Sequence, residues 1–436
     1  MHFLYLSLGA LMVLSAFTHG MQKKKPSYSF QPVPRQNNAE IPYQWNVLDY
    51  NFPNNLARQE AEASGNLIPS NAIPIDVQPH YYNKNRLRTF VTIPKFQDGI
   101  PYTLATVSDK KGPNGPILEP YPNYESHNNK NGKNCDAITS AFRVAITECN
   151  QMWVIDAGMV GAEAQCAPQL LLFDLNTDQL IHRYRFNSSL YVSGASLFVT
   201  PIVDVKDPPP RGSCRRAMVY VADVNYHGLV VYDYMQNNAW RIENLFMYPD
   251  PNYGSHSVAG ESFILMDGII GMAADKQNLY FHPMASITEY AVPLRVIDNG
   301  TLFEHDMEAM HETFRPLGKR SSECAASAMD GNNNMYCVTF NPIELIMWNV
   351  NTPYDSKNIK KLPISSEELQ FVSGMKVVRN HQGNEELWML SNRFQKMAAG
   401  TQNFNEVNFR IVVRPLVVVT PVTPNQDLHN KLVFKS

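Results

Sequence analysis

Short apolar runs centred on an aromatic residue recur six times along the chain. Their centres are spaced 63, 67, 60, 56 and 52 residues apart. Such a near-even spacing indicates one supersecondary unit repeated in tandem. The six central residues are Phe90, Trp153, Tyr220, Tyr280, Tyr336 and Trp388.

Each aromatic run lies between two further predicted strands. A strand rich in small and β-branched residues precedes it, at 73–77, 138–146, 198–205, 268–274, 325–329 and 372–378. A second apolar strand follows after a loop, at 103–107, 170–175, 229–234, 287–292, 345–350 and 409–413. Small residues suit the innermost strand of a propeller blade, because the blades converge there on a narrow axis. The pattern predicts an all-β fold, a six-bladed β-propeller of four-stranded antiparallel blades.

The two ends of the repeat indicate how the ring closes. The last unit runs out of strands near Leu416, whereas the segment Tyr43–Tyr50 precedes the first unit as an isolated strand. An open blade would expose a sheet edge. We therefore expect Tyr43–Tyr50 to form the outer strand of the last blade, within a propeller that spans 41–419. Two unrelated β domains are the alternative, which the near-even spacing disfavours.

The N-terminus predicts secretion. The apolar stretch Phe3–Phe17, with small residues up to Gly20, is too short to span a bilayer and is typical of a signal peptide over 1–20. A buried N-terminal helix is the alternative. Residues 21–40 are expected to be a flexible leader and 420–436 a loose tail. No other segment has the ~18 uninterrupted apolar residues of a membrane span.

The composition limits the partners. Hydrophobic residues make up 44% of the 436 residues, enough for a substantial core, and the formal net charge is −3. Nucleic-acid binding is disfavoured, because the phosphate backbone requires clustered Lys and Arg. The chain has no dinucleotide fingerprint, P-loop, G-x-S-x-G elbow or zinc spacing. We therefore predict no cofactor and no metal.

The six cysteines predict disulfides, since an even count in a secreted chain is typical of a disulfide framework. The repeat register favours one bridge across the turn at 329–334, one between equivalent positions of adjacent units, and a third between two loops. One pair left as buried thiols is the alternative, with Cys337 its foremost candidate. The favoured pairs are Cys324–Cys337, Cys149–Cys214 and Cys135–Cys166.

Two sequons accompany these cysteines. Asn187-Ser188-Ser189 and Asn299-Gly300-Thr301 predict N-glycosylation at Asn187 and Asn299.

Histidines in turns and at strand ends are candidate general bases. His227 follows the strand that ends at Asp223, His282 ends another strand, and His127 lies in a polar loop. Imidazole can exchange a proton near neutral pH. For each one the alternative is a turn histidine bonded to the backbone.

Acidic residues at the starts of the inner strands are candidate ligand groups. Asp136, Asp267 and Glu323 could meet a cation that enters the central channel, or could cap turns and pair with arginines. The strand that ends at Phe340-Asn341 places an aromatic ring beside an amide, which suits a flat ring bearing an amine. Ordinary packing between blades is the alternative.

Several stretches together resemble the insect yellow / major royal jelly protein family. They run in the family's order over roughly 40–416, and they are CDAITSAFRV (135–144), MWVIDAG (152–158), PQLLLFDL (168–175), VAD with GLVVYD (221–233), DGIIGM (267–272), LYFHPMAS (279–286) and SAMD (327–330). The resemblance is to the yellow-type members and implies a secreted six-bladed propeller. The chain departs from the family at Ile270, where an aromatic is usual, at Ile346-Met347 and at Cys324 and Cys337.

The resemblance implies two functions of different classes. The first is a dopachrome isomerase of the melanin and cuticle-pigmentation pathway, which forms a dihydroxyindole. It requires a base, His227 or His282, and a carboxylate anchor, Arg143.

The second function is the binding of a biogenic amine, such as dopamine or serotonin, in the central channel without catalysis. Asp267 would hold the ammonium group and Phe340 the ring. The other residues predicted to line this site are Ile270, Ser327, Thr339 and Asn341. An extracellular structural protein without a small ligand is a third possibility.

Overall fold

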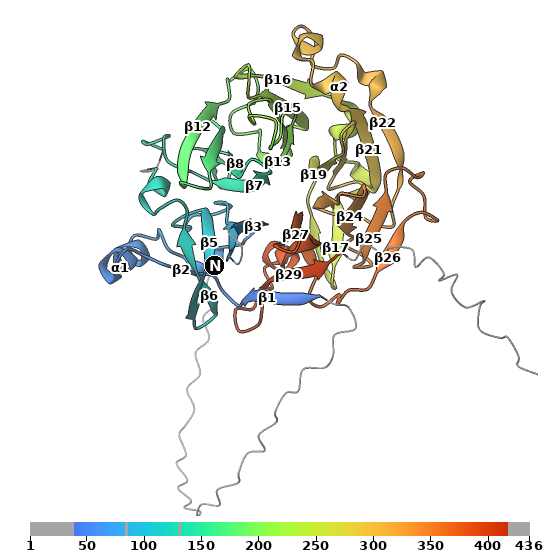
Figure 1. Ribbon diagram of the computed structural model, residues 1–436. Helices are drawn as coiled ribbons and strands as arrows, with labels where there is room; N and C mark the ends of the chain where they lie inside the picture. Colours follow the sequence, from blue (N-terminus) through green and yellow to red (C-terminus); the bar gives the residue numbers. More distant parts are fainter. Residues whose placement is uncertain (1–38, 83–85, 130–131, 417–436) are drawn as a thin grey trace, which may run out of the picture. The chain divides into compact units, whose positions relative to one another are not determined.

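Six antiparallel sheets surround a common axis in the computed structural model, which describes residues 39–82, 86–129 and 132–416 (Figure 1). Blade 1 holds β3 (Asp76–Tyr82), β4 (Arg86–Thr92), β5 (Leu104–Gly112) and β6 (Gly115–Pro120). Blade 2 holds β7 (Ala141–Thr147), β8 (Gln151–Asp156), β11 (Gln169–Asp174) and β12 (Gln179–Arg185). Blade 3 holds β13 (Phe198–Val205), β14 (Ala217–Asp223), β15 (Gly228–Asp233) and β16 (Asn238–Glu243).

The second half of the ring repeats this order. Blade 4 holds β19 (Ile269–Ala274), β20 (Asn278–Pro283), β21 (Thr288–Pro293) and β22 (Arg315–Lys319). Blade 5 holds β23 (Ser327–Met329), β24 (Asn334–Val338), β25 (Leu345–Asn349) and β26 (Lys360–Leu362). Blade 6 holds β27 (Phe371–Arg379), β28 (Glu385–Asn392), β29 (Phe409–Pro415) and β1 (Glu40–Trp45). The predicted six-bladed propeller is confirmed.

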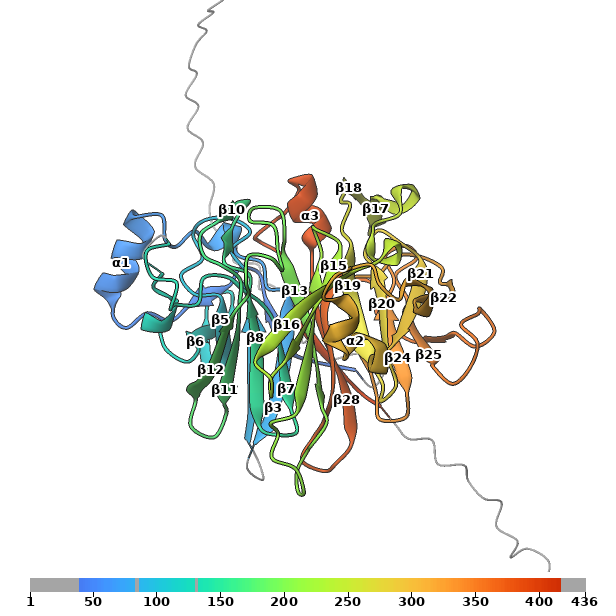
Figure 2. The ribbon, with the colours of Figure 1, turned by 90° about the horizontal axis from the view of Figure 1, so that it is seen from above.

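Short hairpins and a helix lie at one end of the ring. Two short hairpins, β9 (Met159–Val160) with β10 (Glu163–Ala164) and β17 (Ser255–Val258) with β18 (Glu261–Ile264), lie with α3 (Phe394–Ala399) at the top of Figure 2. Two further helices, α1 (Asn55–Ala63) and α2 (Leu294–Ile297), lie at the periphery. None of the helices in the described part has the length and apolar character needed to cross a membrane.

The repeated aromatics occupy equivalent places in the core. Each lies on the second strand of its blade (β4, β8, β14, β20, β24 or β28), and each is at most 4% exposed. Trp153, for example, meets Tyr234 of the next blade edge to face at 5.2 Å between ring centres. Large rings between blades bury much apolar area, which is why the sequence repeats them.

The innermost strands form a closed ring around the axis. Each of β3, β7, β13, β19, β23 and β27 contacts the inner strand of the blade on either side, and β27 returns to β3. Small side chains such as Ala145, Ala273, Ala274, Ala326 and Ala328 line the narrow part of this axis. The expected small-residue inner strands are therefore present.

The closing strand is shorter than predicted. β1 pairs antiparallel with β29, with Trp45 opposite Phe409, so the first half of Tyr43–Tyr50 closes blade 6 as expected. The second half does not, because β2 (Asp49–Tyr50) pairs in parallel with β6 of blade 1. Tyr50 packs edge-on against Tyr102 of that blade, and this contact draws the chain across the seam between the last and first blades.

All three disulfides follow the favoured pairing. Cys149–Cys214 ties the β7–β8 turn of blade 2 to the β13–β14 loop of blade 3, with 6.1 Å between Cα atoms. Cys135–Cys166 joins two loops at 5.6 Å, and Cys324–Cys337 lies within the region of blade 5 at 6.4 Å. No cysteine is free, so the alternative of a buried thiol pair is wrong.

The expected signal peptide (1–20), nearly all of the leader (21–40) and the tail (420–436) lie outside the described residues.

The seam supplies a stability prediction. Trp45 is 1% exposed and donates from Nε1 to the Pro116 carbonyl of blade 1 at 2.7 Å, so one side chain of blade 6 fastens both sides of the seam. Trp45→Ala should lower the free energy of unfolding by about 3–5 kcal/mol, through the cavity and the lost burial. Chemical denaturation measures this. Leu56→Ala is the control, since Leu56 is 62% exposed; equal losses in both variants would contradict the assigned role of the seam.

Candidate functional site

Two cavities lie on the propeller axis and share a partition. The upper cavity, on the side of α3 and the β17–β18 hairpin (Figure 2), has a volume of about 340 Å³. The lower cavity, between the inner strands, has a volume of about 280 Å³. Arg143 and Ile270 line both cavities and therefore separate them.

The upper cavity is mainly apolar and aromatic. Its lining includes Phe142 at the start of the inner strand β7, Phe371 and Phe394 from blade 6, and the apolar side chains of Val199, Leu265 and Met284. Phe371 stacks on Phe340 behind it at 4.8 Å, and its ring lies 5.1 Å from that of Phe394. This phenyl wall of Phe371 and Phe394 suits the flat face of an aromatic ligand.

Asp267 supplies the negative charge of the upper cavity. It lies just before β19 and is partly buried. Within the described residues its carboxylate has no hydrogen-bond or ion-pair partner. Burial raises the pKa of this carboxyl to about 6, although electrostatic interactions with His256 and Arg143 oppose that shift. An unpaired carboxylate that exchanges its proton near neutral pH can bind a cation or act as a base.

The Arg143 guanidinium is bonded mainly within the protein and has little capacity left to bind a substrate carboxylate. It is 4% exposed and donates from Nη1 to the Thr200 hydroxyl and, at 3.0 Å, to the Ile270 carbonyl. Its Nη2 donates to the Ser373 carbonyl at 2.6 Å. These bonds use three of its five N–H groups, while Nε–H has no partner within the described chain. Burial lowers the pKa of this guanidinium.

None of the three candidate histidines lines an axial cavity, and His127 lines a third cavity off the axis. His282 is fully buried, with Nδ1 at 2.9 Å from Glu289 Oε2 and Nε2 at 3.1 Å from the Cys324 carbonyl. Both ring nitrogens are thus engaged by the protein, and burial lowers the pKa of this imidazole. The structure places His282 in the wall between blades 4 and 5, away from Arg143's cavities.

His227 lies beside Gly268, next to Asp267, but lines neither axial cavity. It has a left-handed φ of 49° and is half-buried. Its Nδ1 donates to the Val224 carbonyl at 3.1 Å, and its ring packs on Tyr248 at 4.8 Å. Burial lowers the pKa of this imidazole. This arrangement is the backbone-bonded turn histidine that the sequence left open as the alternative.

The other predicted ligand residues differ in their position relative to the two axial cavities. Ile270 lines both cavities, and Ser327 lines the lower one, where its hydroxyl has no partner in the described chain. Thr339 donates to the Pro342 carbonyl at 2.7 Å, and Asn341 is exposed. Neither lines an axial cavity, and Phe340 reaches the upper cavity only through Phe371.

The residues that the sequence reasoning missed are Phe371 and Phe394. The inner strand was predicted to start at residue 372, one position after Phe371. The first residues of the inner strands face the upper cavity, as Phe142, Val199 and Ile270 also do. Position at the start of an inner strand is therefore the signal that could have identified Phe371.

The lower cavity contains an ion pair between Lys376 and Asp76. Lys376 Nζ lies 3.1 Å from Asp76 Oδ2 and donates to the Val144 carbonyl at 2.8 Å. Asp76 also accepts from the Val144 amide at 3.0 Å. Burial lowers the pKa of Lys376. Lys376 and Asp76 therefore form an ion pair in the lower cavity, whereas Asp267 in the upper cavity has no ion-pair partner within the described residues.

Comparison with known proteins identifies related sequences. The family model described as Major royal jelly protein matches residues 139–422. Dopaminechrome tautomerase of Drosophila melanogaster is 31% identical over 407 residues, which cover 90% of this chain and 85% of that protein. Major royal jelly protein 9 of Apis mellifera is 33% identical over 404 residues, covering 90% and 91%. Protein yellow of Drosophila simulans is 32% identical over 394 residues, covering 86% and 69%.

Among solved structures, virginiamycin B lyase from Staphylococcus aureus aligns with a TM-score of 0.38 and 9% identity, over 81% of this chain and 98% of that chain. The six-bladed architecture is established independently by the strand pairings.

The raised pKa of Asp267 makes a prediction about stability. The pKa of the Asp267 carboxyl is about 6 in the folded chain, against a usual value of 3.8. Between pH 3.8 and pH 6 the folded state therefore binds more protons than the unfolded state. Stability contributed by this group therefore falls as pH rises from about 4 to about 6 and stays lower above that. Asp267→Asn should be more stable than the wild type by up to about 3 kcal/mol at pH 7.5, with a much smaller difference at pH 4.5.

Denaturant unfolding at the two pH values tests this prediction. The matched control is Asp109→Asn on β5, because Asp109 is exposed. The same stabilisation at both pH values, or in both variants, would contradict the assigned environment of Asp267.

Proposed function

The chain belongs to the major royal jelly protein family, and from this membership we propose that its upper cavity binds a catechol-derived amine or aminochrome and isomerises the aminochrome to a dihydroxyindole. The observation that carries this proposal is the unpaired carboxylate of Asp267 in an aromatic cavity. The similarity to a protein named dopaminechrome tautomerase supports the reaction class.

The reaction is an internal transfer of protons and electrons. One proton leaves each of the two saturated carbons of the five-membered ring. Each time the electron pair of the C–H bond moves into the ring system, and a quinone oxygen takes up a proton, so that both quinone oxygens become hydroxyls. Substrate and product are isomers, so no oxidant or cofactor is consumed. The enzyme has to supply a base near the carbon and a donor near the oxygen.

Asp267 fits the base better than either histidine. Its carboxylate is accessible from the cavity and has a pKa of about 6, close to the operating pH that favours proton exchange. The amide of Asn225, which also lines the cavity, is a candidate donor to a quinone oxygen. Phe371 and Phe394 would hold the ring plane.

The charge of Asp267 also favours one kind of aminochrome. Dopachrome, the substrate expected from the sequence, carries a carboxylate, whereas dopaminechrome does not. A substrate carboxylate in this cavity would be repelled by Asp267, and most of the Arg143 N–H groups are already engaged. We therefore propose that an aminochrome without a carboxylate is preferred over dopachrome.

Amine binding without turnover is the second candidate function. It uses the same residues, since an ammonium group would pair with Asp267 while its ring lies on the phenyl wall. The unpaired carboxylate favours this function as directly as it favours catalysis.

We also propose that the protein is secreted. Three disulfides are consistent with an oxidising extracellular compartment. Asn187 and Asn299 are both exposed and therefore accessible to glycosylation. A secreted product whose electrophoretic mobility is unchanged by peptide N-glycosidase would exclude glycans at both positions.

Catalysis is tested by following dopaminechrome absorbance with purified protein. The wild type should accelerate its loss in proportion to protein concentration, and faster than it accelerates the loss of dopachrome. Asp267→Asn should lower kcat by about 100-fold or more, as expected for loss of a general base. Asp109→Asn on the exposed face should keep full activity. A wild-type rate equal to the spontaneous rate would exclude the enzyme.

Binding is tested by calorimetry with dopamine, serotonin and histamine. At least one of these amines should bind the wild type, and Asp267→Asn should weaken that binding by about tenfold or more, because a buried ion pair is lost. Amine binding without aminochrome turnover would favour the second function. Absence of heat with all three amines would count against both the carboxylate and the phenyl wall as a ligand site.

A further inference from the structure

A third cavity opens beside the upper one, off the propeller axis. This lateral pocket has a volume of about 780 Å³, larger than either axial cavity. Its walls are the segment after α1, the loop between β4 and β5, the loop around Tyr124 to Asn129, and the β9–β10 hairpin. Neither proposed function uses it.

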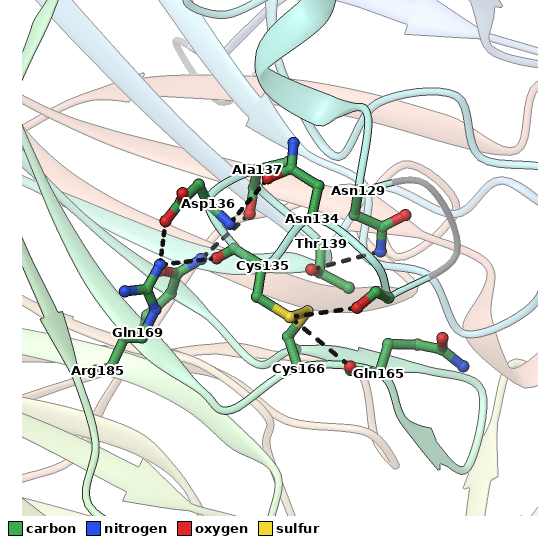
Figure 3. Close-up of a disulfide and its surroundings, with 12 residues drawn as sticks. Asn129, Asn134, Cys135, Asp136, Ala137, Thr139, Gln165, Cys166, Gln169 and Arg185 are labelled. Atoms are coloured by element: carbon green, nitrogen blue, oxygen red, sulfur yellow. Dashed lines mark hydrogen bonds and ion pairs between the residues drawn. A yellow bond between two sulfur atoms is a disulfide. The ribbon is translucent and has the colours of Figure 1, made fainter.

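The walls of the lateral pocket are fastened to one another. Figure 3 shows the Cys135–Cys166 disulfide joining the loop that carries Asn129 and Asn134 to the end of the β9–β10 hairpin at Gln165. The amides of Gln165 and Cys166 both donate to the Gly158 carbonyl, at 2.9 and 3.0 Å. On the opposite wall, the Ile68 amide donates to the Gly99 carbonyl at 2.9 Å. These contacts fix the described wall segments around Gln165 and around Ile68 and Gly99, as expected for a binding site.

The lateral pocket and the upper cavity share one wall. Along the β4–β5 loop, Lys95 and Asp98 line the lateral pocket, while Phe96 and Gln97 between them line the upper cavity. A single stretch of chain thus presents charged side chains to one cavity and an aromatic ring and an amide to the other.

Lys95 is an unpaired cation in this wall. Its backbone is fixed, because its amide donates to the Ser140 hydroxyl at 3.0 Å and its carbonyl accepts from the Gly161 amide at 2.8 Å. Its ammonium group forms no hydrogen bond or ion pair within the described residues. The side chain is nevertheless partly buried, and that burial lowers the pKa of the amine.

The nearby carboxylates do not neutralise Lys95 by contact. Asp156 and Asp98 attract it only over longer distances. Asp156 is committed elsewhere, since it accepts from the amides of Thr139, Ser140 and Gly158 and from the side chain of Gln169. A buried charge without a partner is unfavourable, so this ammonium is poised for an external anion.

We propose that the lateral pocket binds a small organic carboxylate whose head group pairs with Lys95. A monoanion is favoured over a phosphate, because Lys95 is the one Lys or Arg among the described residues that line the pocket, which also include Asp98. The ring of Tyr124 and the side chain of Ile100 offer apolar contact, and the amides of Asn66 and Gln165 offer hydrogen bonds. An aromatic or hydroxylated acid matches this set. Such a ligand differs in charge from the cation that Asp267 selects on the axis.

Calorimetry with benzoate, and with its neutral analogue benzamide, tests the proposal on the full chain. Benzoate should bind the wild type and bind Lys95→Met at least about tenfold more weakly, while any benzamide binding stays equal in the two proteins. Lys276→Met is the matched control, because Lys276 is exposed in the β19–β20 turn and lines none of the described cavities. It should bind benzoate as the wild type does.

Further measurements separate this site from a folding defect and from the axial site. Lys95→Met should keep or raise the Tm, since it removes an unpaired, partly buried charge. Asp267→Asn should leave benzoate binding unchanged. No benzoate binding to the wild type, equal binding to Lys95→Met, or tighter binding of inorganic phosphate with the same Lys95 dependence would each overturn the proposal.

Discussion

The pairing of β1 with β29 is the constraint on which the rest of the structure depends. It places the first described strand of the chain in the last blade, so that no blade is left with an open inner or outer position. Trp45 then reaches across to the Pro116 carbonyl of blade 1, beside Gly115, where an added Cβ would lie 2.5 Å from the Trp45 ring. Gly115 also has a φ of 145°, which side chains rarely adopt. Both its backbone conformation and its close contact with Trp45 therefore require a glycine at this position.

Closure of the ring is what creates the axis and therefore the candidate site. The inner strands come from all six blades, and the residues that meet at the partition are distant in sequence. Arg143 of blade 2 is bonded to Thr200 of blade 3, to the Ile270 carbonyl of blade 4 and to the Ser373 carbonyl of blade 6. One buried guanidinium thus links four blades and divides the channel, which explains why it is poorly placed to anchor a substrate carboxylate.

The upper cavity and the lateral pocket each contain one charged side chain without an ion-pair partner, and the two charges are opposite in sign. Asp267 is an unpaired carboxylate in an aromatic cavity, and Lys95 is an unpaired ammonium in a more polar one. Other buried charges form ion pairs, for example Arg241 with Asp223 and Arg320 with Glu289. Since unpaired charges are unfavourable to folding, those that remain on cavity walls are the ones available to ligands.

The sequence by itself determined the architecture, because the aromatic of each second strand and the small residues of each inner strand obey local periodicity. It also indicated the three disulfide pairs, since register fixes which loops lie at equivalent positions. The site depended on tertiary structure. His282 has a suggestive sequence context, yet Glu289 and the Cys324 carbonyl engage both of its nitrogens. Whether Asp267 is paired, and whether Phe371 faces the axis, depends on side chains from other blades, and no local pattern in the chain encodes those contacts.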